Sequence, residues 1–129
     1  MTTRTYTLGQ TGETYAAQWL QKRGYAILER NWRAAYPMRG EIDIIARDGA
    51  TLVIVEVKTR TTQHCGHPSE AVTPRKLTQL RRLAAAWLTH AGVRPRELRF
   101  DVISVLAPSN RYATPTNEWH IDHLKDVRP

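Results

Sequence analysis

Two apolar stretches decide the fold of this chain: GEIDIIA at residues 40–46 and LVIVEVK at residues 52–58. Both consist mainly of β-branched and aliphatic residues, which are typical of buried strands. Between them lies Arg47-Asp48-Gly49-Ala50, whose Asp-Gly pair suits the positive φ angles of a tight turn. The sequence therefore predicts two antiparallel strands joined by a hairpin.

Charged residues interrupt both apolar stretches. A charge withdrawn from water is costly unless it is paired or binds a metal, so carboxylates inside such strands indicate a site. Because strand side chains alternate between faces, we expect Glu41 and Asp43 on one face of the first strand. Ile42, Ile44 and Ala46 are expected on the opposite face.

The second strand carries Glu56 and Lys58 on a single face, and the hairpin lets this face coincide with that of Asp43. Asp43 and Glu56 would supply oxygen ligands to a hard cation such as Mg²⁺. Lys58 would position a water molecule or stabilise negative charge, so the set suits phosphodiester hydrolysis. The alternative is that these residues form the solvated polar face of a half-exposed sheet.

Further motifs make the pattern more specific than a bare Asp…Glu-x-Lys. Together they resemble the bacterial YraN family (UPF0102), which is similar to archaeal Holliday-junction resolvases. The resemblance implies a restriction-endonuclease-like fold, with an active site at Asp43, Glu56 and Lys58. The motifs are Gly12-Glu13, Gly24-Tyr25, Asn31-Trp32-Arg33, Gly40-Glu41-Ile42-Asp43, Glu56-Val57-Lys58-Thr59-Arg60 and Pro74-Arg75-Lys76.

Glu13 belongs to a predicted helix over residues 8–23, which begins with a capping box at Thr7 and Gln10 and ends at Gly24. Its spacing from the apolar residues of that helix places the carboxylate on the face that packs against the sheet. In the resembling resolvases an acidic residue on the first helix completes the metal site, and Glu13 matches that position. The alternative is a partly exposed glutamate on an amphipathic helix.

The remaining pattern predicts one α/β domain over residues 1–129, with a core at about 8–105 and a C-terminal extension over 106–129. The element order is α-β-β-β-α-β, with a mixed central sheet flanked by helices, as the nuclease resemblance implies. The other expected elements are strands over residues 25–31 and 98–105, a helix from Thr73-Pro74 to Gly92, polar loops over 33–39 and 60–72, and a short strand in the tail.

The charge balance favours a polyanionic partner. The chain of 129 residues has a formal net charge of +7 and a pI near 10.1, which suits DNA, RNA or an anionic membrane. An acidic metal pocket in a basic chain favours nucleic acid, DNA more than RNA. We expect Arg60, Arg75 and Lys76 to hold phosphates, and Trp32 is the aromatic residue to test first for a contact with the substrate.

Other signals are weaker. No apolar run is long enough to span a bilayer, and the N-terminus lacks the apolar core of a signal peptide, so a cytoplasmic location is expected. The single Cys65 fits a reducing compartment, and it lacks an argued base as a nucleophile. Zinc ligands at His64, Cys65 and His67, or at His120 and His123, are disfavoured because their spacing is irregular.

The sequence thus predicts a Mg²⁺- or Mn²⁺-dependent endonuclease that acts on DNA, branched DNA included, with metal ligands at Asp43, Glu56 and Glu13. Glu41 is a further candidate at the mouth of the site. The rival hypothesis is a nucleic-acid-binding accessory protein that keeps the fold without cutting. A structural partner-binding protein would leave the buried charges unexplained, and resolvase-like action would imply a homodimer.

Overall fold

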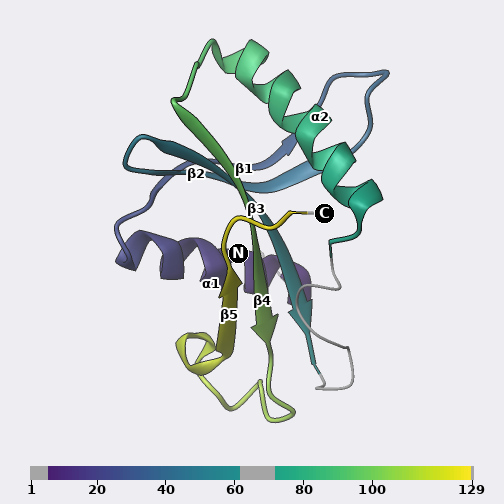
Figure 1. Cartoon of the computed structure of the whole chain (residues 1–129). Helices are drawn as coiled ribbons and strands as arrows, with labels where there is room; N and C mark the ends of the chain where they lie inside the picture. The colour runs from purple at the N-terminus through teal and green to yellow at the C-terminus, as the bar shows by residue number, and fades with distance from the viewer. Residues whose placement is uncertain (1–5, 62–71, 129) are drawn as a thin grey trace, which may run out of the picture.

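Five strands form one mixed sheet in the order β1-β2-β3-β4-β5 in the computed structural model, which describes residues 6–61 and 72–128. β1, β2 and β3 are antiparallel neighbours, β4 joins β3 in parallel after α2, and β5 is antiparallel to β4 (Figure 1). The elements are α1 (Leu8–Lys22), β1 (Ala26–Arg33), β2 (Glu41–Asp48), β3 (Thr51–Arg60), α2 (Pro74–Ala91), β4 (Glu97–Leu106), the 3₁₀ turn η3 (Thr116–Glu118) and β5 (His120–Leu124).

The predicted order of elements is confirmed, and β5 adds a strand beyond the α-β-β-β-α-β core. The hairpin prediction is also confirmed, because β2 and β3 pair antiparallel with Ile45 opposite Ile54. Gly49 in the turn has a φ of 61°, which a residue without a Cβ adopts at little cost.

Both helices begin and end close to the predicted residues. Thr7 and Gln10 exchange the two hydrogen bonds of a capping box at the start of α1. The Thr73 side chain accepts a hydrogen bond from Lys76 N at the start of α2, which ends at Gly92. Neither helix of the described ranges combines the length and apolar character that crossing a membrane requires.

The sheet is covered by one helix on each face (Figure 1). On the α1 face, Val53 and Val55 of β3 pack with Leu20. On the α2 face, Ile54 packs with Leu80. Successive residues of β3 thus point to opposite helices, as strand geometry requires, and both faces are apolar because both are buried.

β2 departs from the expected alternation. Ile42 packs in the α2-face cluster, whereas Ile44 packs in the α1-face cluster, so the prediction that they share a face is wrong. The regular pairing of β2 with β3 ends at Ile44 and Val55. Beyond that pair the Asp43 carboxylate, through Oδ2, accepts a hydrogen bond from Val57 N at 2.8 Å. A side chain therefore replaces the backbone pairing, and the face assignment shifts with it.

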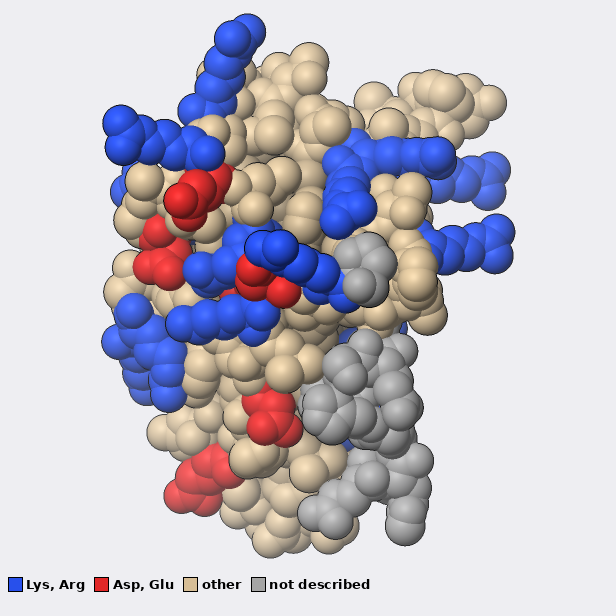
Figure 2. All heavy atoms as spheres, viewed as in Figure 1, with Lys and Arg blue, Asp and Glu red and all other residues tan. Residues whose placement is uncertain are grey.

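Charge is distributed unevenly over the surface. In Figure 2, Lys and Arg side chains lie mainly over the upper part of the molecule, which α2 and the β2–β3 hairpin occupy. The lower part of the same view, around β5 and η3, shows acidic side chains. The net positive charge is therefore concentrated over part of this surface.

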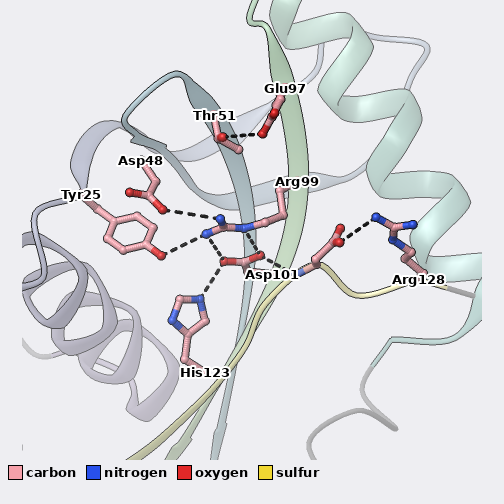
Figure 3. A network of polar contacts seen from close by, with 9 residues as sticks. Tyr25, Asp48, Thr51, Glu97, Arg99, Asp101, His123 and Arg128 are labelled. Carbon is pink, nitrogen blue, oxygen red and sulfur yellow. Dashed lines mark hydrogen bonds and ion pairs between the residues drawn. The ribbon is translucent and has the colours of Figure 1, made fainter.

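A buried network of polar contacts connects β5 and the following residues to β4 (Figure 3). Asp101 on β4 is 1% exposed and its carboxylate accepts hydrogen bonds from Arg99 Nε at 2.9 Å and from Asp126 N at 3.0 Å. His123 Nε2 lies 2.7 Å from the same carboxylate. Burial opposes ionisation, but the bonds from His123, Arg99 and Asp126 hold the pKa of Asp101 below its ordinary value.

We expect Asp101→Asn to lower the free energy of unfolding by about 3 kcal/mol at neutral pH, because it leaves Arg99 without its buried partner. The folded-state pKa of Asp101 is depressed, so its contribution is present above the unfolded pKa and is lost as the pH falls. Urea unfolding at pH 7 and pH 3 measures both effects. Asp122→Asn, on an exposed carboxylate of β5, is the control, and equal stability of the two variants at pH 7 would contradict the assigned role.

Candidate active site

Three carboxylates, one from α1 and two from β2, lie close together. Glu13 of α1 and Glu41 and Asp43 of β2 each offer an oxygen atom, and these atoms all lie within 4.8 Å of one another. All three residues are partly buried. We call Glu13, Glu41 and Asp43 the carboxylate cluster.

Glu13 reaches the cluster because α1 lies very close to β3. A Cβ atom on the preceding residue, Gly12, would lie 2.9 Å from both Cβ and Cγ2 of Thr59, and closer still to its hydroxyl oxygen. Real Cβ atoms essentially never approach so closely, so α1 could not occupy this position with a larger residue at Gly12. The Gly12-Glu13 pair thus couples close helix packing to the placement of a carboxylate.

Asp43 lies at a position of β2 that makes no regular backbone pair with either neighbouring strand. Its carboxylate bonds to Val57 N of β3, as described above. On its other side, the pairing of β1 with β2 passes from Arg30–Ile44 to Trp32–Ile42 without pairing Asn31 to Asp43. Asn31 has a φ of 54°, a left-handed conformation that asparagine tolerates better than most residues.

Asn31 is a site residue that was missing from the predicted set. With its amide nitrogen toward the cluster, Asn31 Nδ2 donates to Glu13 Oε2 at 2.8 Å and to Glu41 Oε1 at 3.3 Å. In the reverse orientation the amide oxygen faces carboxylate oxygens, which is unfavourable unless a cation lies between them. The only signal for Asn31 in the sequence was its place in the Asn31-Trp32-Arg33 motif.

Arg33 is the second residue that the predicted set omitted. Its Nη2 atom lies 3.0 Å from Glu41 Oε2 in an ion pair, with the Arg33 side chain 79% exposed. Glu41 is thereby linked both to the cluster and to a solvent-facing cation. Because exposed ion pairs contribute little to stability, the pair can separate at small cost.

Glu56 lies outside the cluster on β3 and is 5% exposed. Its Oε1 atom lies 3.6 Å from Lys76 Nζ, so Lys76 of α2 reaches over the sheet as its position on the helix predicted. Lys58 follows two residues later on β3 and is exposed. The structure therefore groups Asp43 with Glu13 and Glu41, and places Glu56 beside them with a cationic partner.

The carboxyl groups of Glu13, Asp43 and Glu56 resist ionisation. Burial, followed by the charges of Asp43 and Glu41, raises the pKa of Glu13 to about 7. Burial also raises the pKa of Asp43, although the hydrogen bond from Val57 opposes the shift. Burial and the charge of Asp43 raise the pKa of Glu56 to about 7, against the effect of Lys76. These groups thus lack the positive charge that would let all of them ionise.

A divalent cation fits this donor set. Mg²⁺ and Mn²⁺ prefer oxygen ligands, and the cluster supplies oxygens from Glu13, Glu41 and Asp43 with the Asn31 amide adjacent. Carboxylates that repel one another when ionised would gain most from such a cation. The residues present therefore suit a hard divalent metal better than a soft one.

The other predicted residues lie around the site in different ways. Arg75 is exposed in the first turn of α2, and Arg60 is partly buried at the end of β3. Trp32 packs against the α2-face cluster. His120 and His123 face Asp122 and Asp101, while His64, Cys65 and His67 lie outside the described residues.

The five-stranded mixed sheet and its two flanking helices are consistent with a nuclease-like fold. The chain belongs to the uncharacterised protein family UPF0102, whose family model matches residues 12–105. The predicted resemblance to the YraN family is therefore confirmed.

Similar proteins occur in several bacteria. The chain is 47% identical over 120 residues to a UPF0102 protein of Beutenbergia cavernae, and the matched region covers 93% of this chain and 94% of that protein. It is 54% identical over 99 residues to one of Leifsonia xyli, covering 77% and 81% respectively. A UPF0102 protein of Geotalea uraniireducens is 44% identical over 120 residues, covering 93% of this chain and 87% of the relative.

We expect Glu56→Gln to stabilise the metal-free protein at pH 8 by about 1–2 kcal/mol relative to the wild type, and to lose this advantage near pH 4. The pKa of Glu56 is raised from 4.5 to about 7 in the folded protein, so the folded state favours the protonated carboxyl. The free energy of unfolding of the wild type therefore falls as the pH rises from about 4.5 to 7 and Glu56 loses its proton. Urea unfolding in EDTA at both pH values measures the difference. Glu118→Gln, on an exposed glutamate of η3, is the control, and parallel pH profiles of wild type and Glu56→Gln would contradict the assignment.

Proposed function

We propose that this chain is a Mg²⁺- or Mn²⁺-dependent endonuclease that hydrolyses phosphodiester bonds of DNA. The observation that carries the proposal is the convergence of Glu13, Glu41 and Asp43 within 4.8 Å, beside Glu56 and its partner Lys76. A structural role alone gives no reason to gather three carboxylates here, since burial, followed by the charges of Asp43 and Glu41, raises the pKa of Glu13.

The cation would be held by Asp43 and Glu13, with Glu41 and Glu56 as adjacent carboxylates. When bound, it would polarise the phosphoryl oxygens and lower the pKa of a coordinated water. Asp43 is fixed for this task by its hydrogen bond from Val57 N. Without the cation the Asn31 amide nitrogen can donate to Glu13 and Glu41, and with the cation bound the amide would turn its oxygen toward the ion.

Lys58 would act on the water or on the developing negative charge. An ammonium group has only donors and no lone pair, so it cannot be a metal ligand. Lys58 is exposed, and it follows Glu56 by two residues, so strand geometry places both on the same face of β3. Its charge acts on Glu56 across that face.

Phosphates would be held by Arg60, Arg75 and Lys76. Arg75 projects from the first turn of α2, at the end of the helix where Lys76 contacts Glu56. The net charge of +7 supplies the long-range attraction that brings a polyanion to an acidic pocket. We expect DNA rather than RNA as the substrate, in the cytoplasm.

The resemblance to resolvases extends the proposal to branched DNA and to a homodimer that matches a two-fold junction. The rival proposal is a nucleic-acid-binding accessory protein without cleavage activity. One observation favours it: Glu56 is paired with Lys76 and lies outside the carboxylate cluster. Cleavage and metal binding, measured separately, distinguish the two.

Asp43→Asn should lose both Mn²⁺ binding and cleavage, because it removes the charge of the central carboxylate without changing its size. Lys58→Ala should keep metal affinity and lower the single-turnover rate by about a hundredfold or more, as expected when a preorganised electrostatic group is lost. Calorimetry measures the first property. Cleavage of linear, flapped, four-way and single-stranded DNA with Mg²⁺ and then Mn²⁺ measures the second.

Wild-type cleavage by the Lys58→Ala variant would contradict the role assigned to Lys58. Metal and DNA binding without cleavage of any of these substrates would favour the accessory protein. If the wild type binds neither ion at millimolar concentration with DNA present, the metal site itself is wrong.

The affinity for duplex DNA should fall with salt, with a slope of log affinity against log salt of roughly −4 to −5 if about five phosphates are contacted. Arg75→Ala should flatten this slope by about one unit. Arg96→Ala is the matched control, because Arg96 is exposed just before β4, near the hairpin end of the sheet. A wild-type slope near zero, or equal slopes for the two variants, would count against the phosphate contacts proposed here.

A further inference from the structure

A groove runs beside the edge strand β1, between residues 34–40 and α2. It consists of two adjoining cavities of about 440 Å³ and 490 Å³, both lined by Pro37 and Met38. The first is also lined by Trp32 and His90. These volumes lie within the range of sites that take small organic groups.

Two rings offer flat surfaces in the first cavity. The ring centroids of Trp32 and His90 lie 6.0 Å apart with planes tilted by 41°. Trp32 is partly buried and packs against the α2-face cluster, so its ring is held in place by the core. An aromatic group that enters this cavity therefore meets a fixed ring and does not have to order a free one.

The groove is positively charged. Arg33, Arg39 and Arg82 line it, and all three are exposed. Among the described residues that line the two cavities, none is acidic. The groove thus combines an apolar floor with cations, which suits a flat group that carries phosphates.

Arg33 connects the groove to the candidate active site. It lines the first cavity, and its guanidinium is paired with Glu41 of the carboxylate cluster at 3.0 Å. β1 is the edge of the sheet, so no further strand of the described chain separates the groove from the cluster on that side. Arg33 is therefore shared between the groove that Trp32 lines and the carboxylate cluster.

We propose that this groove binds an unpaired nucleotide of the DNA substrate, with its base against Trp32 and its phosphates at Arg33, Arg39 and Arg82. The inference rests on the proposed function and specifies its substrate as DNA with an unpaired segment next to a duplex. A base inside a duplex has both faces covered by its neighbours, so only an unpaired base can stack on a protein ring.

Fluorescence anisotropy tests the proposal with a blunt labelled duplex and the same duplex carrying a short unpaired thymine overhang. EDTA in the buffer prevents metal-dependent cleavage, so the result does not depend on catalysis. The wild type should bind the overhang duplex about 5- to 150-fold more tightly, the range expected when one base stacks on an aromatic side chain. We take the ratio of the two affinities as the overhang preference.

Trp32→Leu should remove most of the overhang preference, and Trp32→Phe should retain part of it. Met38→Glu, which puts an acidic group at a residue that is 38% exposed, should reduce the preference with little risk to folding. Trp19→Leu is the matched control, because Trp19 lies on the α1 face and contacts His123 and Arg23.

Equal affinity of the wild type for both duplexes would overturn this inference and leave the proposed nuclease function standing. An unchanged overhang preference in both Trp32→Leu and Met38→Glu would overturn the location of the site. Failure to bind either duplex in EDTA would overturn this inference, whereas the proposed nuclease function is tested separately by cleavage with Mg²⁺ and Mn²⁺. A wild-type preference that Trp32→Leu abolishes supports the inference even if no cleavage is found.

Discussion

The carboxylate of Asp43 takes the hydrogen bond of Val57 N–H at 2.8 Å, where regular pairing of β2 with β3 has ended. In a regular antiparallel sheet a backbone carbonyl accepts such a bond, so here a charged side chain takes its place between two strands. The rest of the site depends on this hydrogen bond between the Asp43 side chain and the backbone of β3. It fixes Asp43 within reach of Glu13, while on the neighbouring strand Asn31 makes no regular pair with Asp43.

Two aspartates, Asp101 buried and Asp43 partly buried, show how local donors decide what a carboxylate does in this chain. Asp101 is surrounded by Arg99, His123 and Asp126 N–H, which lower its pKa. Through His123 and Asp126 it connects β4 to β5 and the residues that follow. Asp43 has one backbone donor and carboxylates as neighbours, and burial, which that donor only partly opposes, raises its pKa. The first arrangement is complete without a ligand, whereas the second would gain charge balance from a divalent cation. This contrast is the physical basis for assigning function to Asp43.

The sequence predicted the elements well because their signals are local. The Asp-Gly turn, the capping box at Thr7 and the proline at the start of α2 each act within a few residues, and the structure contains all three. The side-chain faces of β2 could not be predicted, because the alternation rule assumes unbroken pairing and Asp43 breaks it. Asn31 was missed because its left-handed backbone and its place beside Glu13 and Glu41 arise in the folded structure, with no local signal for either in the sequence.

A direct test of the central claim is to locate Mn²⁺ in crystals of the wild-type protein by anomalous scattering. We expect a peak at bonding distance from an Asp43 oxygen and from at least one oxygen of Glu13 or Glu41, with the Asn31 amide oxygen turned toward the ion. The same crystals of Asp43→Asn should show no peak there. Absence of the peak from wild-type crystals at millimolar Mn²⁺, or a peak bound only at another place, would contradict the account.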